Sequence, residues 1–215
     1  LDFKSGLADG DFCIEFKPDP AYNGLLFNRY NDVNGTLFIE LEIEVENEYS
    51  NKFTVAALEF LDQPVTAIGV YINDDGHDSK TELHPLDCLY GDLPQSQWPA
   101  WTIEKRSNLP SDYGFKVIRF LSAGDDSWGL HPPKSMEQRT INVHIAMPTP
   151  DTGKTHLYDW TSRIGTEDSA YLDTFDIVKN PKADGCFEFN VTPYRTGFGP
   201  STIMVDFAVW WKIIP

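Results

Sequence analysis

Apolar and polar residues alternate along much of the chain, and the clearest alternation covers residues 37–46. Side chains two residues apart lie on the same face of a β-strand, so this segment predicts a strand with one apolar and one acidic face. The apolar face holds Leu37, Ile39, Leu41, Ile43 and Val45, and the acidic face holds Glu40, Glu42, Glu44 and Glu46. Like charges about 7 Å apart along a strand repel each other, so we expect the acidic face to be solvated. A cation-collecting surface is the alternative interpretation of the same row.

The same pattern predicts a β-hairpin and several further strands. Two apolar, β-branched runs, Val65–Ile72 and Thr81–Leu89, flank the turn-forming segment Asn73–Lys80, which is typical of a hairpin. Further strands are expected at residues 11–17, 52–60, 115–121, 139–147, 155–160, 186–191 and 202–213. Helical spacing is confined to short stretches at 22–29 and 169–178. The segment 101–113, with Pro110 and turn-forming residues, is expected to be a long surface loop.

Short strands separated by Gly-, Pro- and Asp-rich loops predict an all-β fold. The aperiodic segment 91–99 contains two prolines, so we place a boundary there between two closely packed parts. Residues 1–92 are expected to form a barrel-like or OB-like part and residues 93–215 a β-sandwich-like part. A single continuous domain is the alternative, because 215 residues can bury a sizeable core in either arrangement.

Charge restricts the partners of the chain. The formal net charge is −16 at pH 7, with a pI near 4.5. Electrostatic attraction supplies most non-specific binding to nucleic acid, so we expect neither nucleic acid nor an anionic membrane surface as a partner. No apolar run approaches the length of about 20 residues that spans a bilayer. We therefore expect a soluble protein; the sequence does not fix its compartment, and secretion is the favoured one.

The three cysteines, Cys13, Cys88 and Cys186, are too few and too widely spaced for a disulfide scaffold or a paired-thiol zinc motif. Each alternates with large apolar neighbours. We therefore expect buried, reduced side chains that act as small hydrophobes, with a single disulfide as the alternative.

The densest gathering of titratable groups lies in and beside the hairpin loop, with His77, Glu82, His84 and Asp74 as its candidate metal ligands. Glu82 and His84 are two residues apart on the predicted strand and therefore share a face. Two imidazoles and a carboxylate can hold zinc or another divalent metal and leave a position for water, the arrangement of a metal-dependent hydrolase. The alternatives are acid–base catalysis and structural bracing, in which His84 and Glu82 hydrogen-bond the loop.

The signature Asp74-x-x-His77-x-x-x-x-Glu82-x-His84-Pro85, preceded by the acidic strand and by Val65–Gly69, resembles a group of uncharacterised, mostly bacterial proteins. Those proteins look like small β-barrels or OB-like domains that end in a Glu-Ile-His-Pro strand, and Leu83 replaces the isoleucine here. The resemblance spans about residues 9–90. It implies a fold and a local cluster but no activity, and the acidity of the chain conflicts with the nucleic-acid role of many OB-like barrels.

Four tryptophans lie in or near predicted loops: Trp98, Trp101, Trp128 and Trp160. Exposed indole rings among Asp, Asn and Thr can stack on sugar faces or anchor a protein partner, although a tryptophan near a loop more often caps a β core. There is no phosphate loop, dinucleotide fingerprint or nucleophile elbow. We therefore predict a non-enzymatic protein that binds a carbohydrate or protein ligand and needs no cofactor. A zinc-dependent or other metal-dependent hydrolase is the alternative.

Overall fold

The structure of the chain is a computed structural model. It describes residues 2–5, 12–16, 19–21, 32–33, 36–37, 39–43, 60, 63–74, 80–111, 113–122, 141–147, 155–164, 175–181, 186–193 and 203–214. For part of these the backbone alone is described. Side-chain burial is given for residues 19–21, 60, 63–69, 71, 83, 88–111, 113–121, 141–147, 159–163 and 204–212.

Strands make up 58% of the described part, against one short α-helix, so the all-β prediction is confirmed. The strands are β1 (Asp2–Ser5), β2 (Phe12–Phe16), β3 (Asp32–Val33), β4 (Thr36–Leu37), β5 (Ile39–Ile43), β6 (Val65–Asp74), β7 (Lys80–Asp92), β8 (Phe115–Ser122), β9 (Ile141–Ala146), β10 (Thr155–Ile164), β11 (Phe175–Pro181), β12 (Cys186–Pro193) and β13 (Ile203–Ile214). The helical elements are the 3-10 helix η2 (Gln95–Gln97) and the α-helix α2 (Ala100–Ser107).

The chain divides into two compact units. The first comprises Leu1–Leu89, Leu121–His131 and Phe198–Thr202, and the second comprises Tyr90–Phe120, Pro132–Gly197 and Ile203–Pro215. The division at 89/90 falls inside β7, close to the boundary predicted near residue 92. Each unit is built from three separate segments of the chain. The predicted division into residues 1–92 and 93–215 stays a prediction.

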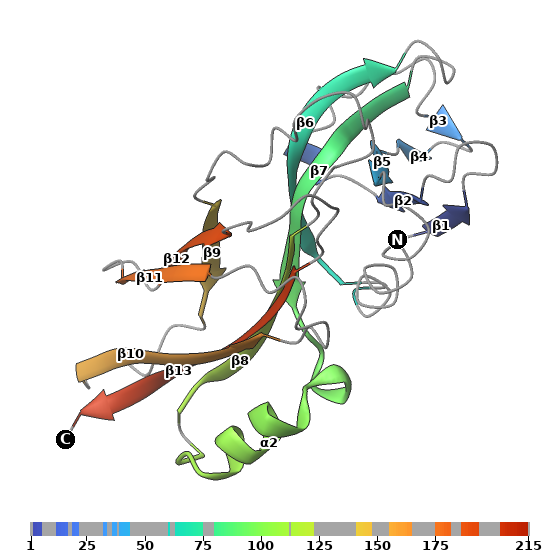
Figure 1. Cartoon of the computed structure of the whole chain (residues 1–215). Helices are drawn as coiled ribbons and strands as arrows, with labels where there is room; N and C mark the ends of the chain where they lie inside the picture. The colour runs from blue at the N-terminus through green and yellow to red at the C-terminus, as the bar shows by residue number, and fades with distance from the viewer. Residues whose placement is uncertain are drawn as a thin grey trace. The chain divides into compact units, whose positions relative to one another are not determined.

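In the first unit the strand order is β1-β2-β5-β7, and β6 pairs with β7 (Figure 1). The two runs of the predicted hairpin are therefore confirmed as paired strands, each longer than its apolar run. β1 pairs with β2 and β2 with β5 in antiparallel fashion, whereas β5 pairs with β7 in parallel. Phe60, Cys88 and Leu89 are each fully buried among the described side chains of this unit, which confirms the predicted burial of Cys88.

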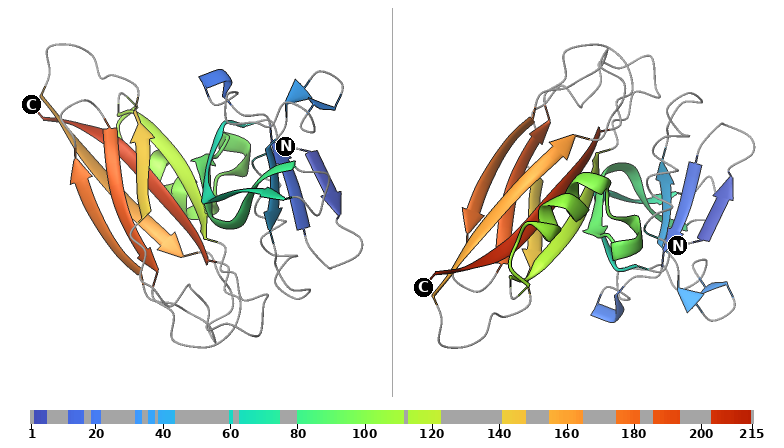
Figure 2. Two further views of the ribbon diagram at one scale, coloured as in Figure 1. Left: turned by 90° about the horizontal axis from the view of Figure 1, so that it is seen from above. Right: turned by 90° about the horizontal axis from the view of Figure 1, so that it is seen from below.

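The core of the second unit lies along β8 and β13. On β13 every residue from Val205 to Trp211 is buried. On β8 every residue from Val117 to Phe120 is buried as well. A strand whose two faces are both buried must have another element packed against each face, and in this unit the two elements differ. β9, β11 and β12 form a separate three-stranded sheet on one side of β13, and α2 lies on the other (Figures 1 and 2).

The neighbouring residues Trp210 and Trp211 lie on opposite faces of β13, because successive side chains of a strand point to opposite faces. The Lys105 ammonium of α2 lies 4.5 Å from the centroid of the Trp210 ring. On the other face, a Cβ added to Gly114 would lie 3.0 Å from Cδ1 of Trp211 and 3.7 Å from Cε of Met147. The glycine thus leaves room for the Trp211 ring beside the end of the β9 segment.

The alternation predicted for β9 is confirmed. Ile141, Val143 and Ile145 are buried, whereas Asn142 and His144 are exposed. β9 therefore has one face in the core and one in solvent, which is the condition that produces a period-2 sequence.

The predicted surface loop at 101–113 is wrong over its first half, because Ala100–Ser107 forms α2. The helix begins directly after Pro99, where a missing backbone N–H costs nothing, and Oγ1 of the buried Thr102 donates to the Pro99 carbonyl at 2.7 Å. After the helix, the Arg106 guanidinium donates to the carbonyls of Pro110 and Ser111 at 3.1 Å each. The prolines that suggested a loop therefore mark the two ends of a short helix.

Two other assignments change. Helical turns predicted at 169–178 are wrong from Phe175 onward, because Phe175–Pro181 is the strand β11, whose β-branched Ile177 and Val178 pair with β12. The strand β1 was not predicted, because its four residues are too few to show a period. The predicted strand at 52–59 and helical turns at 22–29 lie outside the described residues.

Candidate functional site

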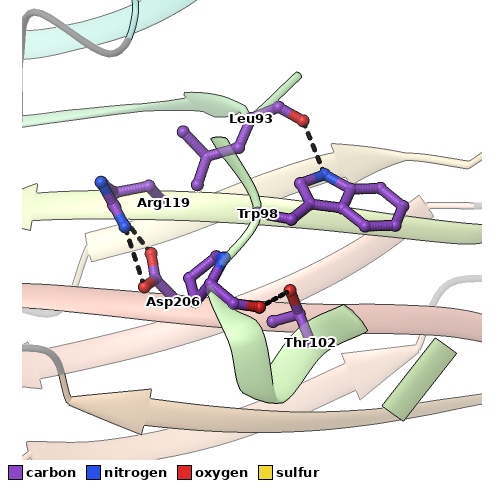
Figure 3. Close-up of polar contacts among 6 residues, drawn as sticks. Leu93, Trp98, Thr102, Arg119 and Asp206 are labelled. Atoms are coloured by element: carbon purple, nitrogen blue, oxygen red, sulfur yellow. Dashed lines mark hydrogen bonds and ion pairs between the residues drawn. The ribbon is translucent and has the colours of Figure 1, made fainter. Parts of the chain in front are cut away.

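Trp98, a predicted ligand-binding residue, is held against the core of the second unit (Figure 3). Its indole Nε1–H donates to the Leu93 carbonyl at 2.9 Å, and its ring meets the Phe115 ring edge-on at 5.1 Å between centroids. Phe115 in turn stacks on Trp210 at 6.3 Å. Since the indole has a single donor, Trp98 has none left for a ligand. This geometry is that of a tryptophan that caps a β core.

Replacing Trp98 by phenylalanine keeps most of the ring and removes the donor to Leu93. We expect the free energy of unfolding to fall by about 1 kcal/mol, the usual net contribution of one hydrogen bond, with some further loss from the smaller ring. Urea unfolding followed by far-UV circular dichroism measures it. An unchanged midpoint would contradict the capping role.

Trp101 lies in a different setting. It is the second residue of α2, is half-buried, and has the guanidinium carbon of Arg163 at 5.2 Å from its ring centroid. Arg163 lies on β10 and is exposed. Asp159 and Thr161 precede it by four and two residues, so the three share one face of β10. Asp159 is exposed too, and its Oδ1 accepts from the Trp160 backbone N–H at 2.9 Å.

Trp160 belongs to the opposite face of β10. Its ring lies 6.3 Å from that of the buried Phe207, at an interplanar angle of 43°. The structure therefore does not bring Trp98, Trp101 and Trp160 together on one surface. Trp128, the fourth predicted ligand-binding residue, lies outside the described residues.

A buried ion pair crosses from β8 to β13 in the second unit (Figure 3). Nε of Arg119 donates to Oδ1 of Asp206 at 2.7 Å, and Nη2 donates to Oδ2 at 3.0 Å. Their side chains are only 6% and 4% exposed. On the other side of β13, Arg163 is the register partner of Asp206. Sequence reasoning missed this pair, although a charge inside each of two strongly apolar strands was a signal.

The residues of the predicted metal cluster are only partly described. Asp74 ends β6, and Glu82 and His84 lie two residues apart on β7 and share a face as predicted, but their side chains are not described. His77 lies outside the described residues. No group of three or more His, Cys, Asp or Glu that could hold a metal occurs among the described side chains. The metal-dependent hydrolase therefore stays a prediction.

Among the helices in the described residues, none has the length and hydrophobicity that crossing a bilayer requires.

Comparisons with known proteins add no family to these observations. No family model, no curated protein and no solved structure matches the chain. The resemblance of residues 9–90 to small barrel-like or OB-like proteins therefore stays a prediction, and function has to be argued from the residues themselves.

Proposed function

We propose that the chain is a non-enzymatic binding protein whose ligand is a neutral carbohydrate, bound at a surface formed by Trp101, Asp159 and Arg163. We call this the Trp101 surface. The observation that supports it is the stack of Arg163 on Trp101, in which a half-buried indole lies beside an exposed guanidinium.

The chemistry of these three side chains suits a sugar. An indole face attracts the apolar C–H face of a pyranose ring, while planar groups with paired donors or acceptors hydrogen-bond neighbouring hydroxyls. Arg163 supplies the donors and Asp159 the acceptors, and both are exposed. A net charge of −16 repels acidic polysaccharides, so a neutral ligand fits the chain better.

The test is the change in affinity when one side chain of this surface is removed. Cellohexaose, xylohexaose and laminarihexaose are titrated into the purified chain, and binding is followed by calorimetry and tryptophan fluorescence. Trp101→Ala should weaken binding about tenfold or more, because aromatic contacts contribute about 0.5–1.5 kcal/mol beyond their burial. Arg163→Gln should weaken it as well while leaving the ring in place.

Ile103→Ser is the matched control, since Ile103 lies on the same helix and is 52% exposed. It should bind the hexasaccharides as the wild type does. If no hexasaccharide binds, or if Trp101→Ala and Arg163→Gln bind with unchanged affinity, the carbohydrate proposal fails. A protein partner lost with the same two variants would then be the better interpretation.

Three finer statements belong to the same proposal. The first part is proposed to be barrel-like or OB-like, as the resemblance of its signature implies. The second is proposed to be a β-sandwich, which the separate sheet of β9, β11 and β12 beside β13 supports. Secretion is proposed as the compartment, which suits a protein that meets oligosaccharides.

A further inference from the structure

One long strand of the second unit, β10, lies at an edge of its sheet. β10 ends the strand order β8-β13-β10 and, within the described part of the chain, pairs with β13 alone (Figure 1). Its ladder with β13 runs without a break from Thr155 opposite Ile214 to Ile164 opposite Val205. The backbone N–H and C=O groups on the other side of an edge strand are a template for a further strand.

β10 lacks most of the features that keep an edge strand from pairing. Sheet edges are commonly protected by short strands, prolines, bulges and charged side chains. β10 is ten residues long, contains no proline and has no bulge against β13. Its described centre does carry two exposed charged residues, Asp159 and Arg163. These charges favour a partner strand with complementary charges and disfavour others.

The spacing of the two charges makes β10 complementary to itself. Asp159 and Arg163 lie two residues before and two residues after Thr161, on the same face of the strand. When a second copy of β10 runs antiparallel with Thr161 opposite Thr161, each Asp159 stands opposite Arg163 of the other copy. Opposite charges and Thr–Thr pairs both stabilise neighbouring antiparallel strands. A register shifted by two residues loses both charge pairs.

The backbone of β10 is compatible with this register. The register pairs odd-numbered residues with odd-numbered residues, and alternate residues of a strand direct their N–H and C=O groups to the same side. Groups that point away from β13 on one copy therefore meet groups that point away from β13 on the other. Residues 158–164 of the two copies then form one antiparallel ladder.

We propose that β10 joins two copies of this chain about a two-fold axis at Thr161, with Asp159 of each copy paired with Arg163 of the other. The same surface is used on both copies, so the assembly closes as a dimer. One pair of strands is a small interface, and we expect a weak dimer with a Kd on the order of 10 μM. The net charge of −16 repels a second copy, but this repulsion is screened beyond about 8 Å at physiological ionic strength.

The dimer is compatible with the Trp101 surface. Arg163 has five N–H donors, of which a carboxylate uses two at most, so donors remain for a ligand. The two Trp101 surfaces lie on the same face of the joined sheet, so a carbohydrate of several rings can contact both. This consequence rests on the proposed function, whereas the dimer itself does not.

Charge reversal tests both the partner and the register. In Asp159→Arg and in Arg163→Asp, both charge pairs of the dimer become repulsive. The Kd of the full chain, measured by sedimentation equilibrium at about 0.15 M NaCl, should rise about tenfold or more in each variant. An equimolar mixture of the two variants regains attraction at both pairs and should form heterodimers. The double variant Asp159→Arg, Arg163→Asp should dimerise as the wild type does.

Glu104→Arg is the matched control, since it makes the same change of charge at an exposed position of α2. It should keep the wild-type Kd. A wild-type chain that stays monomeric at about 300 μM, far above the Kd expected for a small interface, would overturn the proposal. Unchanged dimers in Asp159→Arg and Arg163→Asp, or a mixture and a double variant that both stay monomeric, would overturn it too. Trp101→Ala keeps both charges and should still dimerise, so a failure of carbohydrate binding is distinguishable from a failure of the dimer.

Discussion

Replacing Arg119 by methionine is expected to lower the free energy of unfolding by about 3–5 kcal/mol, the usual cost of removing one partner from a buried ion pair. The carboxylate of Asp206 accepts two hydrogen bonds from Arg119, at 2.7 and 3.0 Å, and is almost inaccessible to solvent. Methionine fills most of the space but leaves that charge without its main partner. Urea or thermal unfolding of the variant measures the loss.

Two further variants separate charge from packing. The double variant Arg119→Met, Asp206→Leu removes both charges together, and replacement of a buried pair by apolar residues is often neutral, so it should recover most of the loss. Lys116→Met breaks the exposed pair of Lys116 with Asp92, whose atoms are 2.6 Å apart but whose side chains are 28% and 54% exposed. It should cost no more than about 1 kcal/mol. A cost this small for Arg119→Met as well would show that the buried pair contributes little.

The sequence predicts those elements whose environment is uniform along the strand. β9 has one buried and one exposed face, so its alternation leads directly to its burial pattern. β13 is buried on both faces from Val205 to Trp211, and its nearly continuous apolar run predicts a strand without indicating what covers each side. α2 was missed because its eight residues are few for a helical period and lie between prolines. Here tertiary packing against Trp210 outweighs the local pattern.

The candidate sites depend on strand order, which no local pattern contains. The position of β10 at the edge of its sheet becomes visible only when β10 pairs with β13, although β11 and β12 lie between them in sequence. In the same way, Arg163 of β10 meets Trp101 of α2 across more than 60 residues of chain. Their position near loops made the four tryptophans look like equivalent ligand-binding residues in the sequence. In the structure Trp98, Trp101 and Trp160 have different contacts: Trp98 donates to the Leu93 carbonyl, Trp101 lies beside Arg163, and Trp160 lies near Phe207.

Replacing Phe207 by alanine is the second large effect that we expect, with a loss of about 3–5 kcal/mol in the free energy of unfolding. Phe207 is fully buried on β13, among the largest side chains that are so in the described part, and its ring lies 6.3 Å from that of Trp160. Neighbouring strands hold the backbone of β13 in place, so the space left by the ring cannot collapse fully.

Phe207→Leu, which fills part of that space, should lose less, and Ile103→Ala on the exposed side of α2 should stay within about 0.5 kcal/mol. Since small domains have only about 5–15 kcal/mol of stability in total, thermal melts should show a clearly lowered Tm for Phe207→Ala. A Tm close to that of the wild type would mean that β13 is not the centre of this core.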